Sequence, residues 1–277
     1  MKDMLTVKTL YAIDPEAAKG LDTMGLRRSF LIEDTFCDGE IRLTYTHYDR
    51  LIVGGVVPAG GELVLDEVAE CGTPTFLERR ELGILNIGDK GSISAGGNSW
   101  DLNKGDMLYL PMASGPVTFS GNGRFYLASA PAHQPYPATL IRPEDANQVK
   151  LGSPETSNDR SICQSIHPDG VKSCQLMMGY TKLHNGSVWN TMPAHLHDRR
   201  MEAYLYFDVA EGQRVFHFMG QPHETRHLVV ANEEITISPP WSIHSGAGTG
   251  SYTFCWVMAG DNMSFADMDM VAMEDLK

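Results

Sequence analysis

The chain of 277 residues repeats one series of short strands twice, and this internal repeat is the feature that most limits its fold. Short runs rich in β-branched and aromatic residues, broken by Gly, Pro, Asn and Asp, fill the first half, and a second series begins at Cys174. ERRELGILNIG from Glu78 matches DRRMEAYLYFD from Asp198 at an offset of 120 residues. GDMLYLP ending at Pro111 matches EEITISP ending at Pro239 at an offset of 128. The pattern predicts two tandem all-β barrels.

The two strand series are separated by a segment with five prolines, from Pro131 to Pro154, which is typical of a linker or crossover. We therefore expect an N-terminal barrel over residues 1–140 and a C-terminal barrel over residues 141–277. Few helices are expected: one short helix within residues 15–31 and one at the end of the chain.

Composition excludes several classes of function. The formal charge of −13 argues against nucleic acid and anionic membranes as partners, because both require a basic surface. No apolar run reaches the roughly 18–20 residues of a membrane span, and five cysteines without a CxxC pair are typical of reduced packing residues. A cytoplasmic protein is expected. Nucleotide-binding glycine motifs and the GxSxG elbow are absent from the sequence.

The stretch PAHLHDRRME from Pro193 carries the clearest chemical signal. His195 and His197 are two residues apart, so on an extended segment both imidazoles project from the same side. Glu202 stands at the start of the next predicted strand, and His244 follows a Pro-Pro turn where it can supply a fourth ligand. Three His and one Glu form a ligand set for a first-row metal.

The internal repeat predicts which barrel holds the metal. The two offsets place four residues of the first half opposite the four ligand candidates of the second, and none of them is a useful metal ligand: Thr75, Leu77, Leu82 and Pro116. We expect one metal per chain, in the C-terminal barrel.

The repeat also sorts the arginines that are candidates for binding an anionic substrate. Arg199 and Arg200 have counterparts in the metal-free half, which favours a structural role for at least one of each pair. Arg226 has no such counterpart, because Asn98 lies opposite, and it is the first candidate for an anion. Arg199 is the second candidate for binding an anionic substrate. Trp241 precedes His244 and is predicted to form either a wall of the pocket or part of the core.

Two resemblances emerge from these motifs. The HxHx4E stretch and the downstream segment from Glu233 to His244 resemble the two motifs of the cupin superfamily, with Glu233 and Trp241 standing where glycines are usual. More closely, THYDRLIVGG from Thr46, MPAHLHDRRMEAYLYFD from Met192 and ISPPWSIHSGAGT from Ile237 resemble the 5-keto-4-deoxyuronate isomerase family over nearly the whole chain.

The family resemblance implies an aldose-ketose isomerase that converts 5-dehydro-4-deoxy-D-glucuronate to 3-deoxy-D-glycero-2,5-hexodiulosonate in pectin breakdown. It also implies a cytosolic homohexamer with Zn²⁺ held by His195, His197, Glu202 and His244. From the ligands alone, Fe, Ni, Mn and Cu also fit. A Lewis-acid metal suits a reaction in which negative charge grows on substrate oxygens.

Two routes are open for the transfer of hydrogen between the two reacting carbons of the substrate. If a base forms an ene-diolate, Glu202 is the first candidate, with Tyr206 and His227 as alternatives. A direct hydride shift is the other route. Three other functions fit the same ligand set: a related deoxyuronate isomerase of inositol catabolism, a cupin dioxygenase with a redox metal, and a sugar-binding cupin without turnover.

Overall fold

The computed structural model describes residues 4–261, 264 and 266–277, and these fall into two compact units. Unit 1 comprises the described residues up to Leu10 together with Asp34–Asn147 and Ser165–Met177. Unit 2 comprises Tyr11–Glu33, Gln148–Gln164 and Met178–Lys277. Unit 1 continues past the expected boundary after residue 140 as far as Asn147, residues 11–33 belong to the later unit, and residues 165–177 belong to the earlier one.

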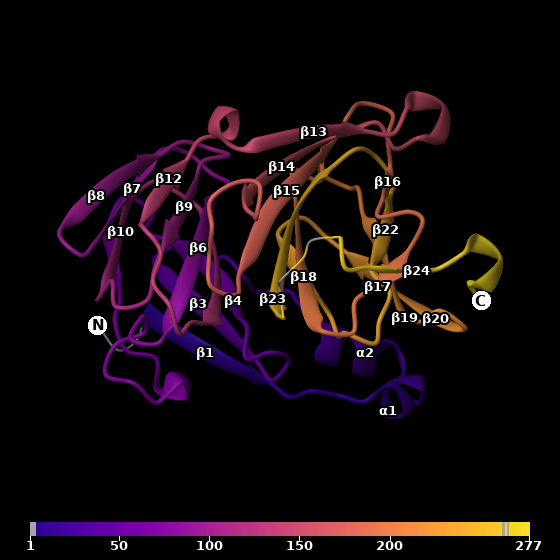
Figure 1. Ribbon diagram of the computed structural model, residues 1–277, viewed down its shortest axis with the longest axis horizontal. Coiled ribbons are helices and arrows are strands. Elements are labelled where there is room, and N and C mark those ends of the chain that lie inside the picture. Colours follow the sequence, from indigo (N-terminus) through magenta and orange to yellow (C-terminus); the bar gives the residue numbers. More distant parts are fainter. Residues whose placement is uncertain (1–3, 262–263, 265) are drawn as a thin grey trace. The chain divides into compact units, whose positions relative to one another are not determined.

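Unit 1 consists of two sheets (Figure 1). The larger sheet has seven strands, in the order β1 (Leu5–Leu10), β3 (Glu40–Thr46), β4 (Ile52–Val57), β11 (Phe125–Pro131), β6 (Arg80–Asn86), β9 (Met107–Leu110) and β12 (Thr139–Ile141). The smaller has four, in the order β5 (Glu62–Leu65), β10 (Val117–Gly121), β7 (Gly91–Ala95) and β8 (Asn98–Leu102).

Unit 2 repeats this architecture. Its seven-stranded sheet has the order β13 (Asn147–Leu151), β14 (Arg160–Ile166), β15 (Met177–Leu183), β23 (Thr253–Gly260), β18 (Arg200–Phe207), β21 (Glu234–Ser238) and β2 (Leu31–Ile32). Its four-stranded sheet has the order β16 (Trp189–Asn190), β22 (Ser245–Gly248), β19 (Val215–Gln221) and β20 (Glu224–Val230). A two-stranded sheet joins β17 (His195–Leu196) to β24 (Asp269–Met270). The predicted all-β fold with two barrels is confirmed.

The strand registers confirm the internal repeat residue by residue. In unit 1, Leu82 of β6 pairs with Leu110 of β9. In unit 2, Glu202 of β18 pairs with Ser238 of β21. These pairs differ by the same offsets of 120 and 128 that the sequence shows. Leu82 and Leu77 are fully buried in the aliphatic core of unit 1, so apolar packing occupies the positions that carry ligand candidates in unit 2.

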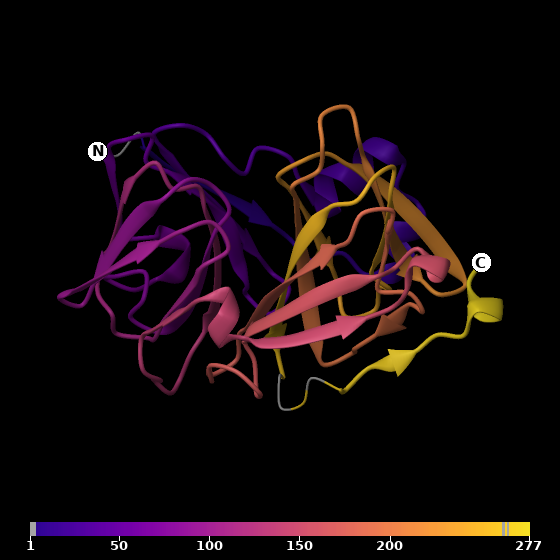
Figure 2. The ribbon, with the colours of Figure 1, turned by 90° about the horizontal axis from the view of Figure 1, so that it is seen from above.

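The helices of unit 2 come from the beginning of the chain. Where one helix was expected, α1 (Pro15–Lys19) and α2 (Thr23–Phe30) form, each capped by the carboxylate of the preceding Asp14 or Asp22. Figures 1 and 2 show both, in indigo, beside the orange strands of unit 2. No helix in the described part of the chain has the length and hydropathy of a membrane span.

The remaining short elements lie in connections. The proline-rich segment expected to be a linker contains β12, β13 and one 3₁₀ turn, and a second turn begins at its last proline. Near the end of the chain a 3₁₀ turn forms where a helix was expected. The structure describes 3₁₀ turns at Ala69–Cys71, Pro143–Asp145, Pro154–Thr156 and Met273–Asp275.

A buried carboxylate ties residues 165–177 to the rest of unit 1. Glu81, on β6, is fully buried and accepts the backbone N–H groups of Cys174, Gln175 and Leu176 at 2.6–2.7 Å. The hydroxyl of Tyr109 donates to the same carboxylate at 2.8 Å. All four donors point at one ionisable side chain, which is why a charge is tolerated at this depth.

Replacing Glu81 by Gln should therefore destabilise the protein. The amide group brings an N–H₂ donor against backbone N–H donors, which costs about 2–4 kcal/mol of the free energy of unfolding. Urea titration measures the loss. The matched control is Glu78→Gln, because Glu78 is exposed and its replacement should change the same quantity by less than about 0.5 kcal/mol. Equal stability of the two variants would contradict this role for Glu81.

Candidate functional site

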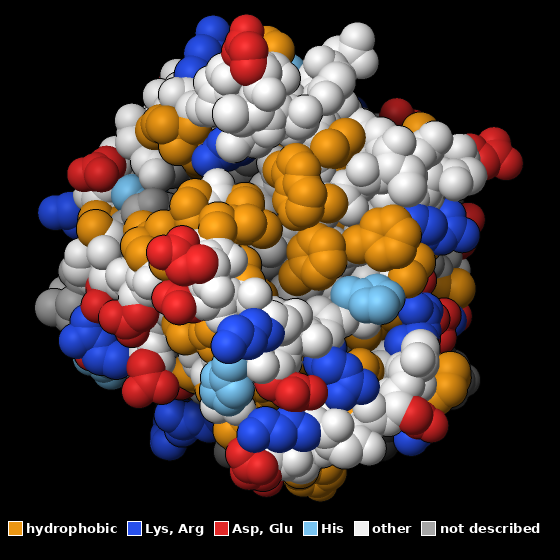
Figure 3. Space-filling view, turned by 90° about the vertical axis from the view of Figure 1, so that its right-hand side faces the viewer, with side chains coloured by type: hydrophobic (Ala, Val, Ile, Leu, Met, Phe, Trp, Pro, Cys, Tyr) orange, Lys and Arg blue, Asp and Glu red, His pale blue; other side chains and the backbone are white. Residues whose placement is uncertain are grey.

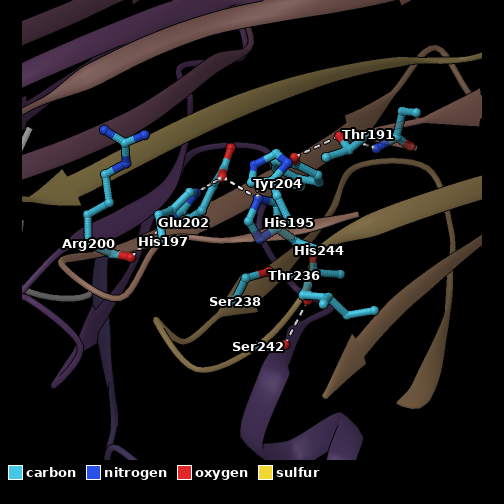
Figure 4. A network of polar contacts seen from close by, with 12 residues as sticks. Thr191, His195, His197, Arg200, Glu202, Tyr204, Thr236, Ser238, Ser242 and His244 are labelled. Carbon is cyan, nitrogen blue, oxygen red and sulfur yellow. Dashed lines mark hydrogen bonds and ion pairs between the residues drawn. The ribbon is translucent and has the colours of Figure 1, made fainter. Parts of the chain in front are cut away.

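Four side chains of unit 2 lie close together in its barrel (Figure 4). His195 lies on β17, His197 follows two residues later, Glu202 lies on β18, and His244 immediately precedes β22. One ligand atom from each side chain lies within 4.8 Å of the others. His195 is half-buried and the other three are at most 4% exposed. Among the residues that the structure describes, this is the only cluster of three or more His, Cys, Asp or Glu side chains suited to a metal.

The hydrogen bonds within the cluster leave electron pairs facing one another. His197 Nδ1 lies 3.0 Å from the carbonyl oxygen of Arg200, so it donates its N–H there and presents a lone pair at Nε2. That nitrogen is 2.9 Å from Glu202 Oε2, which is itself an acceptor. His244 Nε2 lies 2.9 Å from the same oxygen and 3.0 Å from His195 Nε2. Converging acceptors require a cation, either a proton or a metal ion.

The environment sets the protonation states in the direction that metal binding requires. Burial, with repulsion from His244, lowers the pKa of His195 to about 3, so this imidazole is neutral near pH 7. Burial alone would raise the pKa of Glu202, but attraction to His244, together with the hydrogen bonds that an added proton on His197 or His244 makes to the carboxylate, outweighs it and holds that pKa well below its ordinary value. A neutral imidazole and an ionised carboxylate are the ligand forms of these side chains. The donor set therefore fits a divalent metal.

Three members of the cluster, His195, His197 and Glu202, line a cavity of about 350 Å³ in unit 2. One side of this cavity is apolar, with Phe254, Trp256 and Met258 of β23 and the methionines of the segment around β24. The polar side adds Thr191, Tyr204 and Arg160 to the ligand candidates. The volume is that of a small-molecule site.

Two predicted substrate-binding residues, Arg226 and Trp241, lie outside this cavity. The guanidinium of Arg226 donates to the carbonyl oxygens of Lys19 and Leu21, at 3.1 and 2.6 Å, and so holds the helical segment against β20. Trp241 donates its indole N–H to the carbonyl of Ile13 and packs edge-on against Phe30. Neither residue lines the cavity described above. Both fasten the N-terminal segment to the barrel.

Arg199 is also accounted for by contacts within the protein. It forms ion pairs with Asp261 and Asp267, and its side chain is half exposed. The neighbouring Arg200 lines the cavity but is buried, and it donates to the carbonyl of Ser264 at 2.7 Å. Its counterpart in unit 1, Arg80, likewise donates to backbone carbonyls, those of Arg50 and Ser129. These bonds are in keeping with the structural role expected for at least one arginine of each pair.

Of the three candidate bases, only Glu202 lies in the cavity wall. His227 is exposed on the outer side of the four-stranded sheet, where its ring lies 6.2 Å from that of Phe216. Phe216 and Val229 are partly exposed there, and Figure 3 shows hydrophobic side chains gathered on this side of the molecule. Tyr206 is fully buried, and its hydroxyl lies 2.8 Å from His217 Nδ1. The structure therefore separates His227 and Tyr206 from the site.

Thr191 and Arg160 line the cavity although the sequence did not single them out, and Tyr204 lines it as its position on the strand indicated. The Tyr204 hydroxyl lies 3.0 Å from Thr191 Oγ1, and the ring stands edge-on to His244 at 5.7 Å. Burial raises the pKa of Tyr204 well above its ordinary value, so its hydroxyl remains a donor. The only sequence signal for Tyr204 was its strand parity with Glu202, because alternate residues share one face.

The two barrels and the histidine-carboxylate cluster define a cupin-type protein with a candidate metal site in its second barrel. Solved structures agree on the fold: an IolB-like protein from Salmonella typhimurium LT2 has a TM-score of 0.66 at 16% identity, covering 80% of this chain and 86% of that one. Oxalate decarboxylase from Lactobacillus farciminis has a TM-score of 0.54 at 11% identity, covering 76% and 77%.

Sequence comparison identifies the family. Residues 64–274 match the KduI/IolB family, and the chain belongs to it. A relative from Cereibacter sphaeroides, named 4-deoxy-L-threo-5-hexosulose-uronate ketol-isomerase, is 65% identical over 274 residues, covering 99% of this chain and 100% of that protein. The resemblance inferred from the motifs is confirmed, and the chain is an intramolecular oxidoreductase of the isomerase class.

Because His217 is buried, we expect the stability of the protein to depend on pH. His217 is fully buried, and burial lowers its pKa from 6.5 to about 3. Between these pH values the unfolded chain binds a proton at His217 that the folded protein does not. His217 therefore does not lower the free energy of unfolding well above pH 6.5, and lowers it progressively as the pH falls below that value. The expected contribution is about 1.4 kcal/mol per pH unit.

His217→Gln should reduce this pH dependence, because glutamine fills the site without titrating. Urea titrations of wild type and variant at several pH values between 4 and 7 measure the difference. His223→Gln is the matched control, because His223 is exposed and should leave the dependence unchanged. An identical pH dependence in wild type and His217→Gln would refute the prediction.

Proposed function

We propose that this protein is a metal-dependent ketol-isomerase that converts 5-dehydro-4-deoxy-D-glucuronate to 3-deoxy-D-glycero-2,5-hexodiulosonate in the breakdown of pectin. The observation that carries the proposal is the cluster of three imidazoles and one carboxylate, of which His195, His197 and Glu202 line a cavity large enough for a six-carbon acid. The name and full-length similarity of the Cereibacter relative support the substrate.

His195, His197, Glu202 and His244 would hold the metal, which we propose to be zinc. When bound, such an ion supplies Lewis-acid stabilisation of the negative charge that develops on substrate oxygens during isomerisation. The assembly as a homohexamer and the cytoplasmic location stay predictions from the resemblance.

The protein itself would move the proton. Glu202 Oε2 takes the contacts with His197 and His244, while Figure 4 shows the second carboxylate oxygen pointing away from the imidazoles. That oxygen, Oε1, would remove the proton next to the substrate carbonyl and return it to the neighbouring carbon. The hydroxyl of Tyr204 would donate to a substrate oxygen and hold the reacting carbons near Glu202.

A related isomerase of inositol catabolism is the competing assignment within the family. The IolB-like structure from Salmonella supports only the fold at 16% identity, whereas the ketol-isomerase relative is 65% identical over its full length. We therefore favour the pectin-derived substrate.

Purified protein should contain about one equivalent of metal per chain, the stoichiometry of a single four-ligand site. His244→Gln should lower that content at least tenfold, because a ligand is lost. Elemental analysis after dialysis measures it. His227→Gln is the control on the same barrel and should keep the full content. Two equivalents per chain would contradict a single site.

Wild-type protein should convert the aldehyde uronate to the diketo acid, and in D₂O the new CH₂OH group should carry deuterium, because a base exchanges its proton with solvent. Proton NMR of the initial product measures the label. Complete retention of the original hydrogen would instead support a hydride shift and remove Glu202 from the role of base. No conversion at all would refute the proposed substrate.

A further inference from the structure

Arg160 is a cationic side chain in the wall of the same cavity. It lies on β14, which two other strands separate from β18, the strand of Glu202. It begins β14, and it lines the cavity together with Ile162, two residues later on the same face of the strand. Thr181 of β15 and Trp256 of β23 continue this wall toward Glu202 of β18. The cavity therefore extends across the neighbouring strands β14, β15, β23 and β18, with Arg160 on β14 and the ligand candidate Glu202 on β18.

The charge of Arg160 is not balanced within the protein. Its one hydrogen bond goes to the carbonyl oxygen of Asn158, at 2.9 Å, and no carboxylate in the described part of the chain lies within ion-pair distance of it. Arg199 differs, because two aspartates neutralise it. Arg160 is only half exposed, and burial lowers its pKa, which means that the charged form has lost part of its hydration. A bound anion would restore the lost interactions.

The spacing of the strands matches the length of a six-carbon acid. Three steps between neighbouring strands separate β14 from β18, or about 14 Å before any offset along the strands. The side chains of Arg160 and Glu202 both project into the cavity and shorten this separation. In a hexuronate the carboxyl carbon is four and five bonds from the two carbons that exchange hydrogen, which is about 6–7.5 Å along the chain at about 1.5 Å per bond. One such molecule can span the two side chains.

We propose that Arg160 binds the carboxylate of the substrate and thereby fixes which end of the molecule reaches the histidine-carboxylate cluster. The inference rests on the proposed function, because it concerns the orientation of a uronate in that site. The planar guanidinium offers a paired contact to a carboxylate that a lysine cannot reproduce. Arg200 is the less suitable cation, because it is buried and donates to the carbonyl of Ser264.

The test combines a change in the protein with a change in the substrate. Arg160→Met keeps the length of the side chain and removes its charge, and the substrate is compared with a neutral analogue that carries a primary alcohol in place of the carboxylate. We expect kcat/KM for the uronate to fall about 10- to 100-fold, mainly through KM, as for loss of a charged hydrogen bond. The value for the neutral analogue should change less than about threefold.

Two controls separate this role from a structural one. Arg160→Lys should retain only part of the wild-type activity on the uronate. Arg214→Met changes an exposed arginine outside the cavity and should retain all of that activity. The metal content of Arg160→Met should equal that of the wild type. A fall in kcat/KM of the same size for both substrates, or no fall for the uronate, would overturn the proposal.

Calorimetric titration with D-galacturonate and D-galactose distinguishes failure of this inference from failure of the proposed function. Wild type should bind the acid more tightly than the neutral sugar, and Arg160→Met should lose that preference. If wild type does not convert the deoxyuronate but shows this pattern, the proposed reaction is wrong and the carboxylate site stands. Equal preference in both proteins, or none in the wild type, would overturn the assignment of Arg160.

Discussion

The convergence of acceptor atoms in the second barrel is the constraint on which the site depends. His197 uses its Nδ1–H on a backbone carbonyl, so its Nε2 lone pair faces Glu202 Oε2. Electron pairs at hydrogen-bonding distance repel one another unless a cation lies among them. The protein can hold these repelling atoms together because strand pairing fixes the position of Glu202, opposite Ser238 and Met258. The folding energy of unit 2 thus pre-forms a site for positive charge.

Much of this could be predicted from sequence because the signals are local. The i, i+2 spacing of His195 and His197 places both on one side of an extended segment, and the offsets of the repeat carry directly into the strand registers. The same offsets placed Leu77 and Leu82, which cannot bind a metal, opposite two ligand candidates, and the structure buries both in a hydrophobic core. Periodicity and spacing are properties of the chain itself, so no tertiary information was needed.

The rest depended on packing partners that are distant in sequence. Arg226 was chosen because the first barrel lacks it, and that difference is real, but its cause is the docking of Lys19 and Leu21 on unit 2. Arg160 was missed because it lies in a strand preceded by a proline-rich stretch that resembles a linker. Its unbalanced charge is visible only when the surrounding carboxylates can be located in space. A comparison of repeats therefore detects what is specific to one barrel without saying why.

The pairing of β2 with β21 ties the order of synthesis to the completion of the fold. Leu31 pairs with Thr236, and Arg27 donates to the carbonyl of Val229, 202 residues further along. During translation Arg27 emerges 202 residues before Val229, so the helical segment is made well before its partner strands. Unit 1 holds its edge strand β12 within its own half, so it can close first. The barrel with the candidate metal site is therefore completed after the first barrel, although its edge strand β2 is synthesised earlier.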